Sequence, residues 1–275
     1  MKVLKKLLSY GVVLGLAVSL VGCSGKSTDN QEANKLEEIK KNSKIVIGTS
    51  ADFPPFEFHK MVDGEDKIVG FDDLLAQEIA KEIGVEVEYK EIDFDGLIGA
   101  LNADKVDVVL AGMSPTEERE KSVDFSDLYY ISKNAVIVRD GDEDKIKTED
   151  DLKKLKVGVQ KGSIQENYVI NTLGLDNAKS LTATPDLILE LKNKNIDAIV
   201  SNESVCMINV KQYDGIKMSK SSIGEDLEEG MAVAIKKGEN NKELIDLINK
   251  KIKELKDSEK MKEFLEEATT QAASK

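Results

Sequence analysis

The residues of this chain that are best suited to chemistry lie in the run Ala-Gly-Met-Ser-Pro-Thr-Glu-Glu-Arg at positions 111–119. The apolar stretch 106–110 before it is typical of a buried strand, and Thr116 followed by two glutamates is typical of a helix start. A strand, a glycine-containing turn and a helix N-terminus in succession leave backbone N–H groups that can bind an anion. Ser114 adds a hydroxyl group, and Arg119 adds a planar set of donors that fits a carboxylate. The run therefore predicts a site for a small organic anion, with a surface ion pair between Arg119 and a neighbouring acid as the alternative.

This run and the segment after it resemble a known protein family. The residues from Gly112 to Arg119, followed by Val-Asp-Phe-Ser-Asp-Leu-Tyr-Tyr at 123–130, are similar to the bacterial extracellular solute-binding proteins of family 3, the amino-acid receptors of ABC importers. The resemblance covers nearly all of residues 44–267. It implies that Arg119, Ser114 and the N–H groups after Gly112 take the α-carboxylate of a bound amino acid.

Aromatic residues follow two further predicted strands. Phe53 begins the loop after the strand at 44–49, and Phe94 lies in the loop after the strand at 85–89. Ligands of open α/β sheets bind beyond the carboxyl ends of the strands. The family resemblance implies that these two rings flank the ligand's side chain, with burial in the core as the alternative for Phe94.

A second strand, glycine turn and helix start occur at 156–165. Two such turns in opposite halves of the chain suggest a ligand held between two helix N-termini. The resemblance implies that the second half completes the site through Gln160, Ser163, Ile164 (by its backbone) and Asn202. Asn202 stands where the family has an acid for the ligand's ammonium group. Glu203 or a backbone carbonyl such as that of Gly112 would then take this role, unless the ligand is not an ordinary α-amino acid.

Residues after the first strand set the other end of the site. Ser50 stands where family members for basic or amide ligands often carry Asp, and Asp52 and Glu57 are nearby acids that could substitute. We therefore predict a polar ligand, with glutamine-like amides and arginine-like cations both open. The segment 69–84 predicts a helix, capped at its start by Asp72 or Asp73.

Composition narrows the possible functions. The chain has 275 residues and a net charge of −13, which argues against nucleic acid and anionic lipid surfaces as partners, since both need basic patches. His59 is the only histidine, so neither a metal site nor a His-dependent nucleophile is predicted, and we expect His59 on the surface. Cys206 lies in an apolar run and is expected to be buried. No cofactor and no catalytic residue are predicted.

The N-terminus predicts export and attachment to a membrane. Three lysines precede the apolar stretch 7–21, which is short for a stable membrane span, and Leu-Val-Gly-Cys at 20–23 resembles a lipoprotein signal. This resemblance implies a signal peptide at 1–22 and a lipidated Cys23 on the outer face of the cell membrane, with an N-terminal transmembrane anchor as the alternative. Residues 23–43 are predicted to form a flexible tether with room for one helical turn at its end.

Strands and helices alternate along the rest of the chain, which predicts the α/β class with mostly parallel sheets. The family resemblance implies a periplasmic-binding-protein-like fold, in which a two-strand hinge joins two α/β lobes around a ligand cleft. Its boundaries would be 44–131 and 227–268 for lobe 1, 132–226 for lobe 2, and 269–275 for a frayed tail.

The implied function is that of a monomeric lipoprotein that closes around a polar amino acid and delivers it to the permease of an ABC importer. Two other classes stay open, because a fold does not fix a function. One is an exported dehydratase on the same scaffold, and the other is a surface lipoprotein that senses ligands or adheres to a partner.

Overall fold

The computed structural model describes residues 34–220, 223 and 229–274. The predicted signal peptide, Cys23 and most of the predicted tether lie outside these residues. Residues 32–275 form one unit by their contacts, and this unit contains two separate five-stranded sheets. None of the described helices combines the length and the apolar character needed to cross a membrane.

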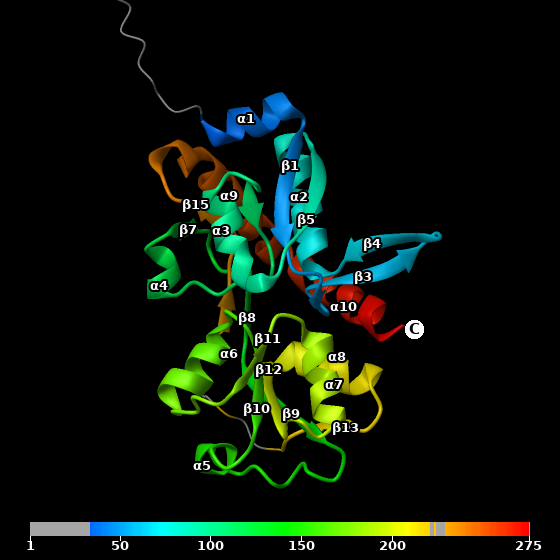
Figure 1. Cartoon of the computed structure of the whole chain (residues 1–275). Helices are drawn as coiled ribbons and strands as arrows, with labels where there is room; N and C mark the ends of the chain where they lie inside the picture. The colour runs from blue at the N-terminus through cyan, green and yellow to red at the C-terminus, as the bar shows by residue number, and fades with distance from the viewer. Residues whose placement is uncertain (1–33, 221–222, 224–228, 275) are drawn as a thin grey trace, which may run out of the picture. The chain divides into compact units, whose positions relative to one another are not determined.

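The first sheet is built from both ends of the chain (Figure 1). Its strand order is β5-β1-β6-β15-β7, with β1 parallel to β5 and β6, and β15 antiparallel to β6 and β7. These strands are β1 (Lys44–Thr49), β5 (Glu86–Glu91), β6 (Val108–Val109), β7 (Val123–Phe125) and β15 (Ala234–Lys236). The helices that pack with them are α1 (Lys35–Asn42), α2 (Phe71–Ile83), α3 (Leu97–Asn102), α9 (Lys242–Asp257) and α10 (Lys260–Ala273), with the short 3₁₀ turns η1 (Phe94–Gly96) and η3 (Glu239–Asn241). Because β1 and β6 end in loops at the same edge, the sheet brings Phe53 close to Gly112.

The second sheet comes from the middle of the chain. Its order is β11-β10-β12-β9-β13, with β10 parallel to β11 and β12, and β9 antiparallel to β12 and β13. These strands are β9 (Asn134–Arg139), β10 (Val157–Gln160), β11 (Lys179–Leu181), β12 (Ala198–Asn202) and β13 (Ile216–Met218). The associated helices are α5 (Glu149–Leu152), α6 (Ile164–Asn167), the π-helical turn η2 (Tyr168–Thr172), α7 (Thr184–Lys192) and α8 (Glu203–Gln212). Gly158 in β10 allows close packing here, because a Cβ atom at this position would lie 2.5 Å from Ile196 Cδ1.

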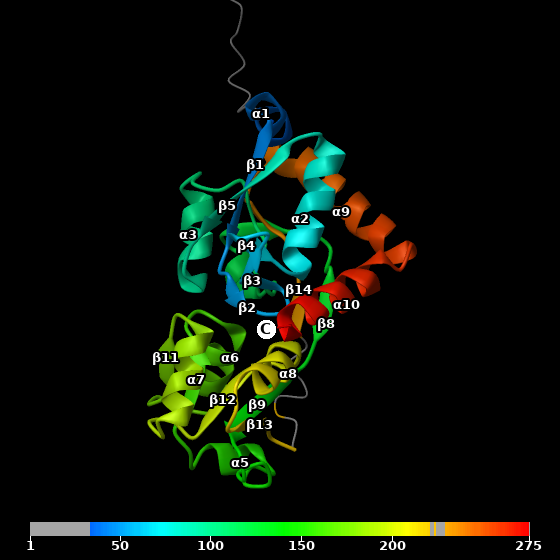
Figure 2. The same ribbon diagram turned by 90° about the vertical axis from the view of Figure 1, so that its right-hand side faces the viewer.

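Two short strands connect the sheets, as the resemblance implied. β8 (Tyr130–Ser132) precedes β9, and β14 (Glu229–Met231) precedes β15. The two strands pair antiparallel, with Ile131 opposite Gly230, and Figure 2 shows them side by side. The mixed α/β class, with two sheet-containing lobes, is therefore confirmed.

A separate three-stranded sheet carries the loop with Phe53. It consists of β2 (Asp52–Phe53), β3 (Glu57–Val62) and β4 (Glu65–Val69), joined in antiparallel order. Phe56 and Phe58 are 0% and 8% exposed, so both side chains are buried. The start of α2 is fixed to this loop, since Phe71 N donates to Pro55 O (3.0 Å) and Asp72 N donates to Phe56 O (2.9 Å).

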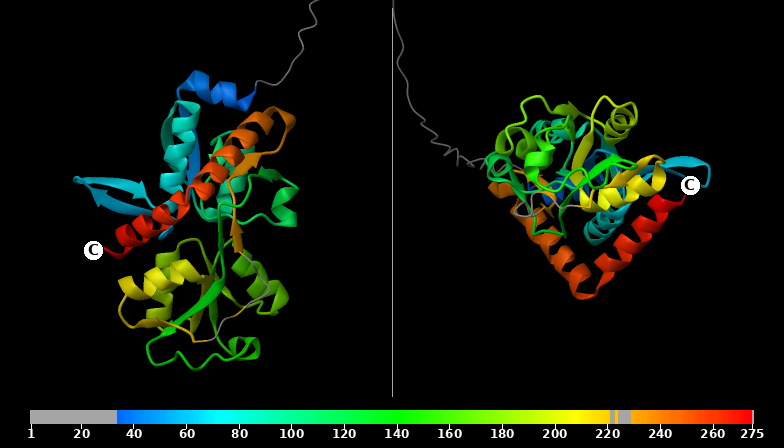
Figure 3. Two further views of the ribbon diagram at one scale, coloured as in Figure 1. Left: turned by 180° about the vertical axis from the view of Figure 1, so that it is seen from behind. Right: turned by 90° about the horizontal axis from the view of Figure 1, so that it is seen from below.

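The two ends of the folded region contain more helix than predicted. Residues 35–42 form the eight-residue helix α1 where the sequence predicted a tether with one helical turn at its end, because Leu36 and Ile39 are buried against the first core. Helix α10 continues to Ala273 through the segment predicted to fray (Figure 3). Ala272 is buried beside Ile208 of α8, and this contact stabilises the last turns of α10.

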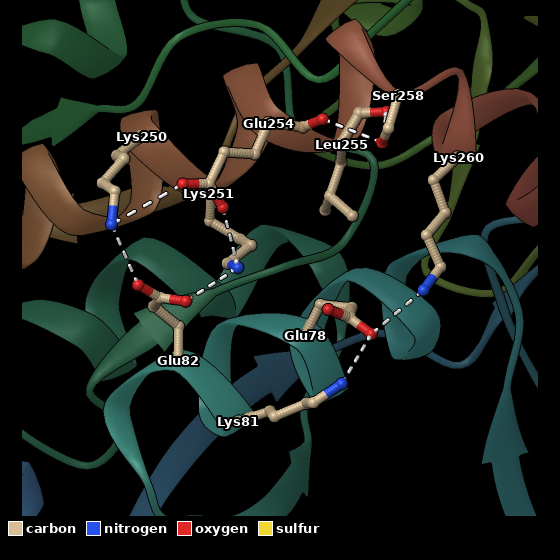
Figure 4. A network of polar contacts seen from close by, with 9 residues as sticks. All are labelled: Glu78, Lys81, Glu82, Lys250, Lys251, Glu254, Leu255, Ser258 and Lys260. Carbon is tan, nitrogen blue, oxygen red and sulfur yellow. Dashed lines mark hydrogen bonds and ion pairs between the residues drawn. The ribbon is translucent and has the colours of Figure 1, made fainter.

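The C-terminal helices are also joined to α2 by charged side chains (Figure 4). Glu82 of α2 contacts Lys250 Nζ (3.2 Å) and Lys251 Nζ (2.7 Å), and Glu78 contacts Lys260 Nζ (3.4 Å). Ion pairs with exposed members contribute little stability. The buried apolar side chains of α9, among them Ile248 and Ile252, therefore hold these helices in place.

Candidate ligand-binding site

Arg119 lies between elements of the two lobes. It belongs to the short helix α4 (Glu117–Glu120), and Thr116 caps this helix as predicted, because its Oγ1 accepts from Arg119 N (3.2 Å). Arg119 Nη1 donates to Ser114 O (2.6 Å) in the first lobe, and Nη2 donates to Gly162 O (2.9 Å) in the second. The guanidinium carbon also lies 5.3 Å from the centroid of the Phe94 ring, in a cation–π arrangement. These partners are two backbone carbonyls and an aromatic ring.

Eight of the twelve predicted site residues, Arg119 among them, surround one pocket. The pocket is lined by Phe53, Phe94, Gly112, Ser114, Arg119, Gln160, Ser163, Ile164 and Gln165. Its volume is about 10 Å³, whereas a wider cavity of about 830 Å³ lies next to it and shares Ser114, Arg119, Ser163 and Ile164. The inner pocket has no room for an amino acid in this arrangement of the lobes. The contacts of these residues with a ligand stay predictions.

The turn after β6 has a left-handed backbone conformation at Gly112, which glycine adopts without strain. Gly112 has φ +55°, and a Cβ atom there would lie 3.1 Å from Cε1 of Phe53. The N–H of Gly112 donates to Asp72 Oδ2 (2.9 Å) inside the protein. An anion in the pocket would therefore use N–H groups beyond Gly112 itself. Sequence reasoning placed Asp72 at the helix cap, but the cap is Gly70 and the carboxylate of Asp72 holds this turn instead.

The second lobe contributes the N-terminus of α6. Ser163 caps it, because its Oγ accepts from Glu166 N (3.0 Å) and donates to Gln160 O (2.7 Å). Gly162 has φ +78°, and a Cβ atom there would lie only 2.8 Å from Cβ of Asp95 in the other lobe. Gln165, the second residue of α6, was missed by sequence reasoning, because a residue just inside a helix carries no signal of its own.

Ser50 and Asp52 line a neighbouring cavity of about 260 Å³. Its other side chains include the acids Glu91 and Asp93. Asp52 Oδ2 accepts from Thr184 N (2.6 Å), the first residue of α7, and Oδ1 is within 3.3 Å of Ser50 Oγ and 3.5 Å of Gln160 Nε2. Burial raises the pKa of Asp52 to about 6, against the opposing effect of the Thr184 and Ser50 hydrogen bonds. Asp52 is thus an acid that contacts both lobes.

Asn202 and Glu203 do not line the cavities described above. Asn202 is 0% exposed, and its Oδ1 accepts from Ser204 N (2.9 Å) and Val205 N (3.3 Å) as the N-cap of α8. The side-chain oxygen of Asn202, one of the residues predicted to complete the site, is therefore engaged by the helix. Glu203 is the first residue of α8, and its N–H donates to Lys133 O (2.8 Å). A role for either residue in holding the ammonium group stays a prediction.

Two further predictions concern residues that could have carried chemistry. Cys206 is fully buried among apolar side chains, which confirms its prediction as a core residue. His59 is exposed, also as predicted, and its ring nitrogens lie 3.1 Å from carboxylate oxygens of Asp66 and Glu91. Among the described residues, no group of three or more His, Cys, Asp or Glu side chains is placed to hold a metal ion.

Two α/β lobes, a pair of connecting strands and a guanidinium group at the junction define a two-lobed ligand-binding protein. The model of the bacterial extracellular solute-binding proteins, family 3, matches residues 45–270, and the chain belongs to this family. It is 35% identical over 263 residues to the arginine-binding extracellular protein ArtP of Bacillus subtilis, covering 93% of this chain and 94% of that protein.

Solved structures of amino-acid-binding proteins are also similar to this chain. A substrate-binding protein of an amino-acid ABC transporter, AbpA from Streptococcus pneumoniae, bound to L-arginine, matches with a TM-score of 0.82 and 37% identity over 87% of this chain and all of that one. An ancestral arginine-binding protein bound to glutamine matches with a TM-score of 0.73 and 41% identity over 82% of this chain and 97% of that one. The similarity to both structures extends over both lobes.

Proposed function

We propose that this protein captures a polar amino acid, arginine-like or glutamine-like, and delivers it to the permease of an ABC importer. The observation that carries the proposal is the position of Arg119, whose guanidinium group lies on Phe94 and donates to backbone carbonyls of both lobes. A carboxylate can replace these carbonyl partners by accepting two parallel hydrogen bonds. The names of the relatives, which describe binding of amino acids, support capture rather than the dehydratase or adhesive alternatives.

The mechanism that we propose is closure of the lobes around the ligand. The inner pocket of about 10 Å³ must widen to admit an amino acid, and rotation about β8 and β14 would widen it without disturbing either sheet. A ligand that contacts Arg119 on one side and the Ser163 turn on the other binds the closed arrangement more tightly than the open one. Closure therefore follows from contacts that only the closed form provides.

The acids beside the pocket support a ligand with a polar or cationic side chain. Asp52, Glu91 and Asp93 line the same cavity, and a cation there would face carboxylates from more than one element. Phe53 and Phe94 could contact the aliphatic stem of such a ligand.

A thermal-shift screen of residues 24–275 against the twenty amino acids tests the proposal. A ligand at 100 times its dissociation constant adds about 2.7 kcal/mol to the free energy of unfolding, so a true ligand is easily detected. L-arginine and L-glutamine are expected to raise the melting temperature, and L-leucine serves as the apolar control. A melting temperature that no amino acid shifts would contradict the proposal and favour a surface lipoprotein with a protein partner.

The substitution Asp52→Asn separates the two ligand classes. Asparagine keeps an oxygen that can accept from Thr184 N but removes the negative charge, so calorimetry should give about tenfold weaker binding of L-arginine and less than about threefold weaker binding of L-glutamine. Because the pKa of Asp52 is about 6, the affinity of the wild-type protein for L-arginine should rise roughly tenfold from pH 5 to pH 7.5 as the carboxylate ionises, and the variant should lose this dependence. Equal losses for both amino acids would assign Asp52 a purely structural role.

We also propose that the protein is anchored to the outer face of the cell membrane through lipid on Cys23 and acts as a monomer. The support is the sequence Leu-Val-Gly-Cys at 20–23 after a basic and apolar leader. In a bacterial host, the full chain should sediment with membranes, and the variant Cys23→Ala should move to the soluble extracytoplasmic fraction. A variant that still sediments with membranes would favour the transmembrane anchor.

A further inference from the structure

Two buried carboxyl groups lie behind the ligand-binding turn. Asp72 is 2% exposed, and its Oδ2 accepts from Gly112 N (2.9 Å) and from Tyr129 Oη (3.0 Å). Glu57 is 1% exposed. Within the described residues, no donor reaches Asp72 Oδ1 or either carboxylate oxygen of Glu57. Buried oxygens without donors are costly, and two carboxyl groups relieve that cost when one of them carries a proton and donates to the other.

The charges around the pair favour that proton. The ionisable groups that act on Glu57 and Asp72 are each other, Asp52 and Tyr129, and none of these is a cation. Burial, and then the neighbouring acids, raise the pKa of Glu57 well above its usual range, and burial raises the pKa of Asp72 to about 6 although its hydrogen bonds oppose this. Two like charges this deep in the protein cannot both persist, so the more strongly affected group, Glu57, takes the proton.

We propose that Glu57 and Asp72 share one proton and act as a single positioning unit for the binding site. The protonated carboxyl of Glu57 donates to Asp72, and the Asp72 carboxylate then fixes the Gly112 turn to Tyr129. No bond other than this hydrogen bond forms or breaks, and the proton stays between the two groups.

The unit joins three parts of the molecule that must keep their spacing. Glu57 lies in β3, where it pairs with Phe53 of β2. Gly112 is the turn beneath the pocket, and Tyr129 N donates to Met231 O (2.8 Å) where β8 and β14 begin their pairing. The carboxyl pair therefore sets the positions of Phe53 and of the Gly112 turn relative to the connecting strands β8 and β14. Only the affinity part of the test below rests on the proposed function.

Two substitutions of similar size distinguish the effect of the donated hydrogen bond from the effect of side-chain volume. Glu57→Gln keeps an N–H donor toward Asp72, whereas Glu57→Met keeps the length and removes the donor. Hydrogen exchange of the Gly112 amide in the ligand-free protein should accelerate about tenfold in the methionine variant and less than about threefold in the glutamine variant. The affinity for L-arginine should follow the same pattern. Glu86→Gln, at an exposed position of β5, is the control and should change neither quantity.

The protonation state can be measured without any ligand. The side-chain carboxyl ¹³C resonance of Glu57 should stay at its protonated position at pH 7, where that of Glu86 is ionised. The folded protein then keeps a proton that the unfolded chain has lost, so the stability conferred by the pair is present below pH 4 and falls as the pH rises toward the raised pKa values. Glu57→Gln should make the free energy of unfolding fall less steeply with pH, and the part of the decline that comes from the raised pKa of Asp52 should remain.

An ionised Glu57 at pH 7, or equal effects of glutamine and methionine on the Gly112 amide, would overturn the proposal. If the methionine variant does not fold, the carboxyl resonance of the wild-type protein and the pH profile of the glutamine variant decide the question. Failure of the wild-type protein to bind L-arginine would contradict the proposed function and leave these ligand-free measurements unaffected.

Discussion

Replacement of Arg119 by lysine is expected to weaken amino-acid binding at least about 100-fold while the protein remains folded. Lysine carries a single ammonium group and cannot give two parallel hydrogen bonds to a carboxylate, and it also lacks the planar guanidinium group whose carbon lies 5.3 Å from the centroid of the Phe94 ring. In a closed complex that shields the pair from water, loss of one of the two charge-assisted hydrogen bonds together with the ring contact is expected to cost about 3 kcal/mol in binding, which corresponds to this factor. Titration calorimetry with the amino acid found in the thermal-shift screen gives the affinity directly.

The stability of the Arg119→Lys variant should change by less than about 1 kcal/mol, because the residue is only partly buried and its present partners include two backbone carbonyls at the cavity. Arg139, the other arginine described in the structure, gives a matched control. It donates to Leu191 O, to Ile196 O (2.6 Å) and to Asp197 Oδ1 (2.8 Å), all within the second lobe.

Arg139→Lys should therefore lower the free energy of unfolding by about 1–2 kcal/mol and leave the affinity unchanged. Opposite effects of the same chemical change at two arginines would separate binding from folding. Normal calorimetric affinity in the Arg119 variant would refute the assignment of this residue to the ligand's carboxylate.

Local sequence patterns were sufficient for the parts of the site that depend on local structure. The strand, turn and cap around Arg119 could be predicted, because a threonine followed by two glutamates is typical of a helix start. The same is true of Ser163, which caps α6 after a glycine turn. Phe53 and Phe94 lie beyond the ends of β1 and β5 as predicted, although Phe53 belongs to the short strand β2 rather than to a loop, and the structure brings both rings to one pocket.

Residues whose partners are distant in sequence could not be predicted in the same way. Asp72 looks like a helix cap from its neighbours, yet its carboxylate binds Gly112, which is 40 positions away. Asn202, the last residue of β12, was assigned to the site by the family resemblance, but its side-chain oxygen accepts from the nearby Ser204 N and Val205 N as the cap of α8. For Asp72 the tertiary arrangement decides between two roles, whereas for Asn202 a local helix cap competes with a role in the site.

The extent of helix at the ends of the folded region was underestimated for a related reason. α1 and α10 are rich in charged residues, so composition alone favours exposed and mobile chain there. A few apolar residues, among them Ile39 and Ala272, are nevertheless buried against other elements, and local sequence does not predict these tertiary contacts. Tertiary packing rather than helix propensity stabilises such helices.

Gly70→Ala is expected to lower the free energy of unfolding by about 4 kcal/mol, the largest loss of stability that we predict. Gly70 precedes α2 with φ +127° and ψ −171°, a conformation open essentially to glycine alone. A Cβ atom there would lie 2.3 Å from Phe56 O and 2.8 Å from Pro55 O. These are backbone atoms, so a side-chain rotation cannot relieve the overlap. Urea denaturation followed by circular dichroism measures the loss.

The effect should extend to the binding site, because the displaced backbone is the loop after Phe53. The carbonyls of Pro55 and Phe56 accept from the first N–H groups of α2, and the chain between them and Phe53 is short. Alanine at position 70 must move either the helix or the loop, so the affinity should fall along with the stability. Gly84 ends α2 with φ +85°, and a Cβ atom there would meet open space, so alanine at this position should cost only about 1 kcal/mol. Similar losses at the two glycines would mean that backbone strain alone is responsible, and that the loop is not held against the start of the helix.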